Sequence, residues 1–434
     1  MRFSPLFSRS ALALTLGAAA MTASPVVAQK KKKEKEAEAA AAAAAASAIS
    51  PSKDYLPEAR KVQAAYNAKD AVALEAALVA ADAVATTPQD KYLQSQFRLQ
   101  LGLLKSDQTL QASALDGMID SGLAPATEAG RFNFFSGQFA YNKKDYAKAA
   151  TRFAAAKAAG HIDPNLDLLL MDSYLQSGRL DDGLAVARAA VIAERAAGKP
   201  PLEEYYVRSA KALQTAGRRE ELLDVLTMRV QDYPKPEIWR NTLFIAMQGA
   251  DKDTTLDILR LMRSVGAMTA RAEVQEYAAL ATEGGLPGEV LAVIDEARAK
   301  GVVPAKDARF DEIYASQKAR TVGDKAALDA DATKGAALPT ARRARSTADA
   351  LFGYGDYTRA AALYQVALDK GDPEADLVML RLGVSQHLGG NREAAKATLA
   401  KVNGPRKRLA SLWLIDVANK QGAMTPAAPA TTGR

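Results

Sequence analysis

Between Asp54 and Gly422, apolar residues recur at helical spacing in segments of about 12 to 17 residues, and Gly, Pro or Asp residues separate these segments. Side chains three or four positions apart lie on one face of an α-helix, so each segment predicts a helix with one apolar face. Clear examples are 146–153, 222–230 and 409–417. Sustained apolar/polar alternation, which is typical of strands, is missing from this region, and no Asn-Gly pair joins two alternating runs as in a β-hairpin. The pattern therefore predicts an all-α fold.

The predicted helices come in pairs, because one short turn recurs along the chain. The turns at 144–146 (KDY) and 178–180 (GRL) lie 34 residues apart, and those at 355–357 (GDY) and 390–392 (GNR) lie 35 residues apart. A further copy at 217–219 (GRR) follows the second after 39 residues, across a longer link. Two antiparallel helices of about four turns with a tight turn use roughly 34 residues. The spacing therefore predicts helical hairpins.

Each turn also has a characteristic set of neighbours. A small residue such as Gly137 precedes it, and an alanine and then a larger residue, such as Ala149 and Phe153, follow it. This arrangement resembles the tetratricopeptide repeat (TPR) family, most clearly over 130–234 and 341–402. The resemblance implies an α-solenoid, a superhelix of roughly ten antiparallel helix pairs with a closing helix. No single pair can bury its apolar face alone, so neighbouring pairs must stack.

The first 28 residues have the features of a secretory signal peptide. Arg2 and Arg9 supply positive charge, 11–20 is an apolar stretch too short to span a bilayer stably, and small residues precede a cleavage site after Ala28. An uncleaved membrane anchor is the alternative. No later segment is long and apolar enough to cross a membrane. We therefore expect a periplasmic bacterial protein without a transmembrane segment once the signal is removed.

The chain divides by composition and repeat content. The predicted organisation is a signal peptide at 1–28, a low-complexity Lys/Ala linker at 29–50, an N-terminal TPR-like array at 51–321, a loosened repeat or hinge at 322–338, C-terminal TPR-like repeats with a capping helix at 339–422, and a disordered tail at 423–434. The linker is either a solvated spacer or a basic tether that touches the cell wall or anionic lipid through 30–36.

Charge argues against a nucleic-acid partner. The formal net charge is +7, but two arginines of the signal peptide and the excess of two lysines in 30–38 account for +4 of it. The remaining +3 is spread over almost four hundred residues, which is not a basic platform for nucleic acid.

The sequence contains few of the residues that commonly serve in catalysis. There are no cysteines and only two histidines: His161 lies in a predicted link, and His387 lies at a predicted helix end, where a cation favours the helix dipole. Phosphate-binding glycine loops and His-Glu-x-x-His are absent from the sequence. We therefore expect no enzyme activity, no cofactor and no metal. A glycan-cleaving enzyme, the alternative, would need a separate compact domain to hold its acid, for which the repeats leave no room.

The TPR resemblance implies a concave face lined by the first helix of each pair, which binds protein or peptide partners. The groove positions that it implies are Phe134, Gln138, Tyr141, Leu168, Asp172, Val207, Lys211, Arg240 and Phe244. Aromatic, aliphatic and charged groups are mixed there, as in a peptide-binding groove. In the alternative interpretation several of them, particularly Phe134, Leu168 and Val207, are packing between repeats.

Basic clusters begin two predicted helices, at 342–345 and at 405–408. Cations at a helix start oppose the helix dipole, so Arg406, Lys407 and Arg408 form either a solvated face or a patch that binds an anion. Taken together, the sequence predicts a non-enzymatic periplasmic scaffold or adaptor. The alternative is a cell-wall or polysaccharide-associated accessory protein recruited through its basic linker.

Overall fold

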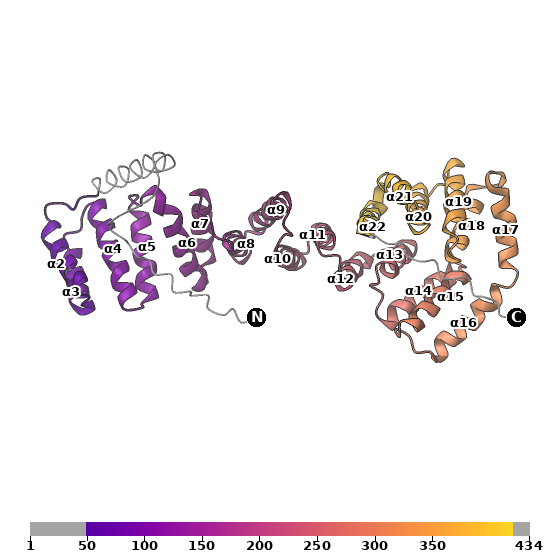
Figure 1. Cartoon of the computed structure of the whole chain (residues 1–434), viewed down its shortest axis with the longest axis horizontal. Helices are drawn as coiled ribbons and strands as arrows, with labels where there is room; N and C mark the ends of the chain where they lie inside the picture. The colour runs from indigo at the N-terminus through magenta and orange to yellow at the C-terminus, as the bar shows by residue number, and fades with distance from the viewer. Residues whose placement is uncertain (1–48, 420–434) are drawn as a thin grey trace, which may run out of the picture. The chain divides into compact units, whose positions relative to one another are not determined.

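The computed structural model describes residues 49–419, and every regular element in that range is a helix (Figure 1). The predicted all-α fold is therefore confirmed. In chain order the elements are α2 (Leu56–Asn67), α3 (Ala71–Asp82), α4 (Pro88–Leu104), α5 (Gln108–Asp120), α6 (Ala126–Asn142), α7 (Tyr146–Ala158), α8 (Leu166–Gln176), α9 (Leu180–Ala196), α10 (Glu203–Thr215), α11 (Arg219–Asp232), α12 (Pro236–Met247), α13 (Lys252–Ser264), α14 (Arg271–Glu283), α15 (Pro287–Ala299), α16 (Ala308–Arg320), α17 (Asp324–Lys334), the 3₁₀ helix η1 (Gly335–Ala337), α18 (Ala341–Gly353), α19 (Tyr357–Asp369), α20 (Ala375–Leu388), α21 (Arg392–Leu399), the 3₁₀ helix η2 (Gly404–Arg406) and α22 (Lys407–Asn419).

The turn that repeats in the sequence has the same backbone geometry in each copy. Its first residue has a positive φ in every case: 63° at Lys144, 80° at Gly178, 70° at Gly217, 78° at Gly355 and 89° at Gly390. Glycine reaches this left-handed region without strain, whereas a residue with a Cβ does so at a cost of roughly 1–2 kcal/mol. The second residue is often a cap: the Asp145 carboxylate accepts the Lys148 N–H and so starts α7. The prediction that the same turn recurs along the chain is therefore confirmed, and Lys144 takes the place of the glycine in its copy.

Helices within a pair approach closely where glycine faces a large side chain. A Cβ on Gly137 of α6 would lie 2.7 Å from the Phe153 ring of α7, and a Cβ on Gly383 of α20 would lie 2.7 Å from Leu399 Cγ of α21. Carbon atoms do not pack at that distance, because the optimum is about 3.5–4.0 Å. The small residue before the turn therefore sets the distance between the two helices.

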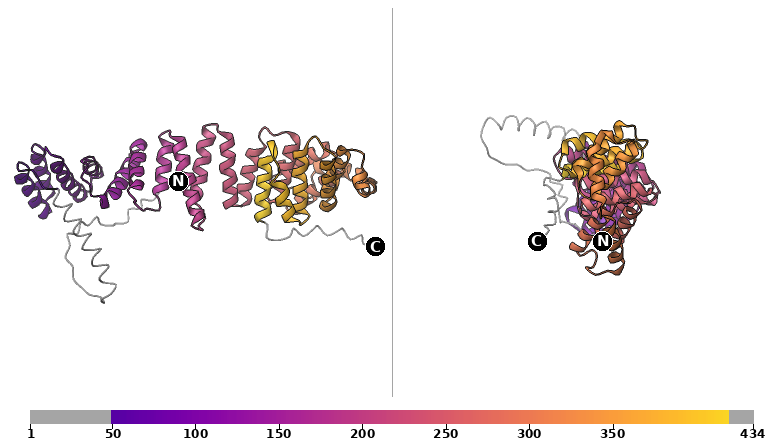
Figure 2. Two further views of the ribbon diagram at one scale, coloured as in Figure 1. Left: turned by 90° about the horizontal axis from the view of Figure 1, so that it is seen from above. Right: turned by 90° about the vertical axis from the view of Figure 1, so that its right-hand side faces the viewer.

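The chain forms two compact units, and each is described by itself. The first ends at Ser177, and its described part contains α2 to α8. The pairs α2/α3, α4/α5 and α6/α7 pack as hairpins, and each contacts the next helix along the chain (Figure 2). Tyr55, Leu74 and Phe153 are fully buried between them. This unit is therefore a simple stack of hairpins.

The second unit begins at Gly178 and contains α9 to α22. One apolar cluster runs from Val230 of α11 to Val417 of α22 and includes both tryptophans of the chain, Trp239 and Trp413. Most consecutive helices pair as hairpins, but α16 packs on α15 while α17 packs on α18. Segment 322–338, the predicted loosened repeat, holds α17 and η1.

The last helices of the second unit return to its earlier helices. Arg381 of α20 binds Asp257 of α13, which precedes it by 124 positions, and Arg408 of α22 binds Asp224 of α11, which precedes it by 184 positions. In a simple solenoid each repeat contacts only its neighbours. The second unit therefore closes on itself, which the repeat pattern did not predict.

Several predictions fall on residues that the structure does not describe. The signal peptide at 1–28 with its cleavage site, almost all of the linker at 29–50, the proposed tether at 30–36 and the tail at 423–434 lie outside 49–419. Within the described range, no helix combines the length and the apolar character that a bilayer-spanning segment needs.

Candidate interaction surface

The exposed members of the predicted groove lie on α10 and α12, the first helices of two successive hairpins. Val207 and Lys211 are one turn apart on α10, and Arg240 and Phe244 are one turn apart on α12, so each pair shares a helix face. The two pairs are offset by 33 residues, which gives them equivalent places in the two hairpins. Val207 is 45 % exposed and Phe244 is 53 % exposed. These four residues are called the α10/α12 face.

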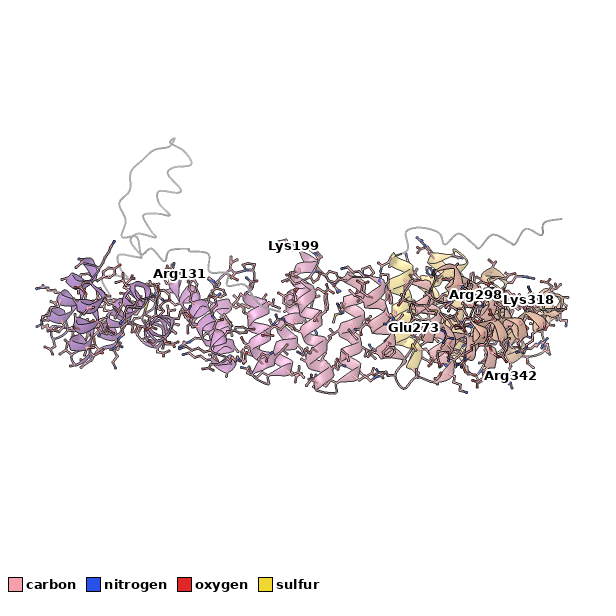
Figure 3. The ribbon with its side chains drawn as sticks, turned by 90° about the horizontal axis from the view of Figure 1, so that it is seen from below. Arg131, Lys199, Glu273, Arg298, Lys318 and Arg342 are labelled. Atoms are coloured by element: carbon pink, nitrogen blue, oxygen red, sulfur yellow. The ribbon has the colours of Figure 1, made fainter. Side chains whose placement is uncertain are left out.

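The α10/α12 face carries positive charge beside its apolar groups. The Arg240 Nε lies 2.6 Å from Glu273 Oε1 of α14. Glu273 is labelled in Figure 3. The second oxygen of Glu273 accepts the Thr269 and Ala270 N–H groups at 2.9 Å, so this carboxylate is fixed at the start of α14. Lys211 is exposed and forms no ion pair within 49–419. The face therefore offers one held guanidinium, one free ammonium and two apolar side chains.

The groove positions of the first unit lie differently. Phe134 is only 3 % exposed, and its ring packs among other aromatic rings of α6 and α7. The Tyr141 hydroxyl donates to the Asp172 carboxylate and so links α6 to α8. Gln138 and Leu168 are half-buried. In this unit the positions implied by the resemblance contribute to packing between helices, and the prediction that they bind a partner stays a prediction.

The predicted anion patch lies at η2 and the first turn of α22. Arg408 lies 2.9 Å from Glu220 and 2.5 Å from Asp224, both in α11. Its charge is therefore balanced by acids of this chain. Lys407 is exposed, and the half-buried Arg406 has an Nε–H without a hydrogen-bond partner among the described residues. Anion binding by this cluster stays a prediction, and an anion at Arg408 would have to compete with two carboxylates.

A cleft that the sequence did not predict opens between α9, α10 and α11, with an empty volume of about 490 Å³. Its lining is mostly apolar and comprises Leu184, Ala187, Val191, Leu213, Val225 and Met228 with Tyr205, Tyr206, Ser209, Arg188, Glu221 and Asp224. The cleft depends on the separation of three helices, which no local pattern encodes. Its apolar walls suit an apolar side chain of a ligand.

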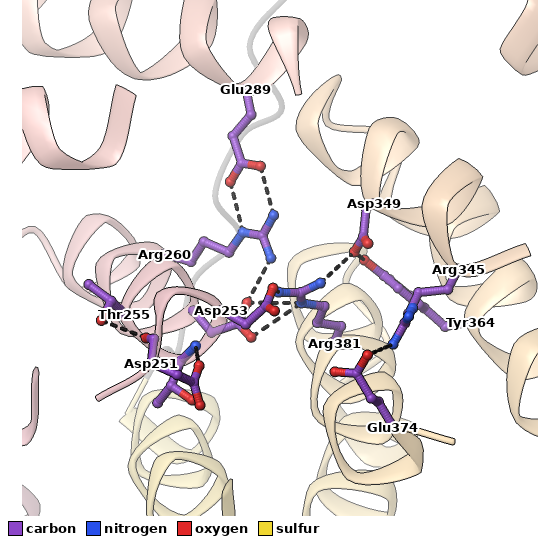
Figure 4. A network of polar contacts seen from close by, with 12 residues as sticks. Asp251, Asp253, Thr255, Arg260, Glu289, Arg345, Asp349, Tyr364, Glu374 and Arg381 are labelled. Atoms are coloured by element: carbon purple, nitrogen blue, oxygen red, sulfur yellow. Dashed lines mark hydrogen bonds and ion pairs between the residues drawn. The ribbon is translucent and has the colours of Figure 1, made fainter. Parts of the chain in front are cut away.

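The second unit also contains a buried network of charged groups (Figure 4). Arg260 of α13 makes two parallel bonds to Glu289 of α15, at 2.8 and 2.7 Å, and a third to Asp257 at 2.7 Å. Arg381 of α20 reaches the same Asp257 at 3.1 Å and Asp349 of α18 at 3.1 Å. The side chains of Arg260, Asp257, Glu289 and Arg381 are each at most 6 % exposed. Because four helices supply these charges, the network fixes how those helices meet.

Burial and charge act in opposite directions on the acids of this network. Burial by itself raises the pKa of Glu289, but attraction to Arg260, with hydrogen bonds from Arg260 and Tyr277, outweighs it, so the pKa lies below its ordinary value of 4.5. Burial beside Glu289 raises the pKa of Tyr277 well above 10.0. Tyr277 therefore stays a hydrogen-bond donor to Glu289, at 2.6 Å.

Sequence reasoning missed this network, although one local signal was present. Asp257 and Arg260 stand inside the apolar run 256–262 (LDILRLM), where a solvated helix face would not place them on an otherwise buried helix. Two charges of opposite sign, three positions apart in such a run, indicate a buried pair. Arg381 also stands in an apolar run, 377–384 (LVMLRLGV), but that run does not indicate that its partner is Asp257, 124 positions earlier.

Each of the two histidines packs against side chains of a neighbouring element. His387 lies in the last turn of α20, as predicted, and its Nε2 is 3.2 Å from Asp416 of α22. His161 lies beside Phe134, with 4.6 Å between ring centroids. Over residues 49–419, no group of three or more His, Asp or Glu side chains is arranged to hold a metal ion.

Comparison with known proteins bears on the fold. No protein-family model matches the sequence, and no curated protein matches it. Solved structures that it is similar to include Naa15/Naa10 bound to HypK-THB (TM-score 0.35, 11 % identity, 82 % of this chain and 63 % of that chain, less than two thirds of its length). A tetratricopeptide repeat protein from Parabacteroides merdae (TM-score 0.26, 14 % identity, 67 % and 100 %) and the TPR2AB domain of yeast Sti1 with a pHSP90 peptide (TM-score 0.24, 16 % identity, 67 % and 98 %) are also similar. At these scores, function has to be argued from the helices themselves.

The predicted resemblance is thus confirmed at the level of fold. Paired helices of TPR length, with the recurring turn at five of the links, make up most of the described chain. The chain is an all-α array of helical hairpins similar to tetratricopeptide repeat proteins.

Proposed function

We propose that this protein is a non-enzymatic scaffold that binds a segment of a partner protein at the α10/α12 face. The observation that carries the proposal is the exposure of Phe244 and Val207 on successive first helices, each beside a cation. Single exposed apolar residues are common on protein surfaces. The 33-residue offset makes Val207 equivalent to Arg240 and Lys211 equivalent to Phe244, so each hairpin contributes one apolar group and one cation at these two places. Together they have the composition of an interface core with a charged surround.

The energetics favour a partner that covers Phe244. Full burial of a phenylalanine side chain is worth roughly 1.5–3 kcal/mol, and Phe244 has more than half of its surface left to bury. Lys211 has no acid to satisfy it within the described chain, so a carboxylate of the partner would gain an unopposed cation. We therefore expect a peptide segment that presents an apolar side chain and an acidic one.

Site-specific cross-linking tests this surface. A photoreactive residue placed at position 244 should capture a partner in intact cells, and Val207→Ser with Lys211→Ser should reduce that capture. The matched control is a photoreactive residue at position 192, because Ile192 is also an exposed apolar residue of the second unit, at 61 %, but lies on α9. Equal capture at 192 and 244, or no effect of the double substitution, would count against the α10/α12 face.

We further propose that the protein works in the bacterial periplasm. The support is the sequence of residues 1–28, with its charged start, short apolar stretch and small residues before the cleavage site. N-terminal sequencing of the protein recovered from the periplasmic fraction should begin at Gln29. A protein that keeps residues 1–28 and sediments with membranes would contradict this.

The second candidate function, association with the cell wall, is favoured by the four consecutive lysines at 30–33. Sedimentation with purified cell wall should fall when 29–50 is deleted if this tether operates, whereas the α10/α12 variants should sediment unchanged. Purified peptidoglycan should show no turnover in either case, because we expect no catalytic activity.

A further inference from the structure

Helix α22 is attached to the second unit by contacts of two kinds. First, it packs on the two helices that precede it, α20 and α21. Its apolar side chains are buried, among them Leu409, Leu412, Trp413 and Val417. Across to the start of the unit it is held on α11 by Arg408, which binds Glu220 and Asp224. Ser264 of α13 adds one hydrogen bond to Asp416, at 2.9 Å. α22 therefore bridges the end of the unit to its beginning.

The two closures of the second unit differ in exposure. The closure made by α20 is buried, because the side chains of Arg381 and Asp257 are 6 % and 4 % exposed. The closure made by α22 is not: the side chains of Glu220 and Asp224 are 71 % and 63 % exposed, and Arg408 is 27 % exposed. Water and salt screen an exposed pair, whereas a buried pair is screened much less. The ion pairs that hold α22 on α11 are thus weaker than those that hold α20 on α13.

The chain next to α22 can accommodate a movement of this helix. Gly404 begins η2 with φ 63°, a conformation that glycine adopts freely, and η2 is a single short turn between α21 and α22. On α22 itself, the indole N–H of the fully buried Trp413 has no hydrogen-bond partner among the described residues. A buried donor without a partner is unfavourable, and release into water would satisfy it.

We infer that α22 is a releasable strap, latched to α11 by Arg408, which opens while the α20 closure stays in place. Opening breaks the Arg408 pairs with Glu220 and Asp224 and the contacts of Asp416 with Ser264 and with His387 of α20. It also turns the chain at Gly404 and uncovers Trp413. In the open state α11 presents two free carboxylates, and α22 presents an apolar stripe that the closed state hides. The device is independent of the α10/α12 face, because the two share no residue.

Charge substitution in the first turn of α22 tests the strap. Arg408→Gln removes the latch, and Lys407→Gln is the matched control, because it removes the same charge one position earlier from a side chain without an ion pair in the described chain. Hydrogen exchange is measured in the full chain over 407–419 and over 375–388. Exposed pairs are worth about 0.2–1 kcal/mol each, so the loss of both Arg408 pairs in Arg408→Gln should speed exchange in α22 about two- to thirtyfold. Exchange in α20 should not change, and Lys407→Gln should match the wild type.

A second measurement reports the exposure of Trp413 directly. In a Trp239→Phe background Trp413 is the only tryptophan, so quenching by acrylamide reports its exposure. Raising the salt to about 1 M, where charges are screened beyond about 3 Å, should increase quenching, as should Glu220→Gln with Asp224→Asn on the α11 side. The inference is overturned if Arg408→Gln and Lys407→Gln exchange alike, if α20 and α22 always exchange together, or if salt leaves quenching unchanged.

Discussion

Replacement of Arg381 by methionine is expected to destabilise the second unit strongly. Arg381 is the only residue that joins Asp257 of α13 to Asp349 of α18 among the described contacts, and its guanidinium is almost completely buried. Methionine keeps an unbranched side chain in the same space but supplies no charge and no donors. The substitution therefore removes the partner and leaves the carboxylates where they are.

The magnitude follows from what each carboxylate keeps. Arg381 also binds Asp253 of α13, at 2.9 Å, but Asp253 is 54 % exposed and loses little, because water replaces the arginine. Asp349 retains the Tyr364 hydroxyl, at 2.5 Å. Asp257 is 4 % exposed and retains one bond, from Arg260 at 2.7 Å. Loss of one partner from a buried pair costs about 3–5 kcal/mol, so we expect the lower end, about 3 kcal/mol, or a more than hundredfold change in the unfolding equilibrium.

Urea unfolding followed by tryptophan fluorescence measures this effect selectively, because both tryptophans lie in the second unit. The midpoint should fall with little change in slope. Arg359→Met is the control: Arg359 also binds more than one aspartate, two where Arg381 binds three, but its side chain is 46 % exposed, so the loss should stay below about 1 kcal/mol. Adding Asp257→Asn should return part of the Arg381→Met loss. Equal midpoints for the two arginine variants would refute the argument from burial.

Three further results are expected. Lys144→Gly should stabilise the first unit by about 0.5–1 kcal/mol, because glycine adopts a φ of 63° without strain. Hydrogen exchange in α6 and α7 should therefore slow. Faster exchange would show that Lys144 is not strained at this turn. Gly137→Ala should lower the thermal midpoint of unfolding. Overpacking against Phe153 costs about 1–3 kcal/mol, whereas the higher helix propensity of alanine contributes only about 1 kcal/mol. Adding Phe153→Leu should restore the midpoint. Glu289→Gln should flatten the loss of stability below about pH 4.5, because a lowered pKa contributes stability that disappears as the pH falls; an unchanged acid limb would exclude Glu289 as its source.

The hairpins could be predicted because their information is local. A helix period and a turn of three residues fall within one window of the sequence, and steric rules at Gly178 or Gly355 fix the turn wherever it occurs. The closure of the second unit could not be predicted in this way. Arg381 and Asp257 are 124 positions apart, and nothing near either residue says which distant charge it meets.

The candidate surface was predictable only in part, because the exposure of a side chain depends on residues that a repeat position does not specify. The resemblance places Phe134 and Val207 alike in their helices, yet Phe134 is 3 % exposed and Val207 is 45 % exposed. Rings of α6 and α7 pack against Phe134, which accounts for its burial. A repeat position therefore indicates the direction of a side chain, and the identity of the neighbours decides whether it is available to a partner.

The buried network has a further consequence for how the second unit reaches one structure. Desolvation of four charges offsets most of their attraction, so the paired network adds little net stability compared with apolar residues of the same size. A displacement of α20 by one turn along α13, however, would separate the buried Arg381 from Asp257 and Asp349, at several kcal/mol for that charge, and would leave each acid with one partner fewer. Apolar helices that slide past each other meet no such penalty. The network therefore acts by excluding other alignments of α20, which is why removal of Arg381 should cost much more than the pair contributes.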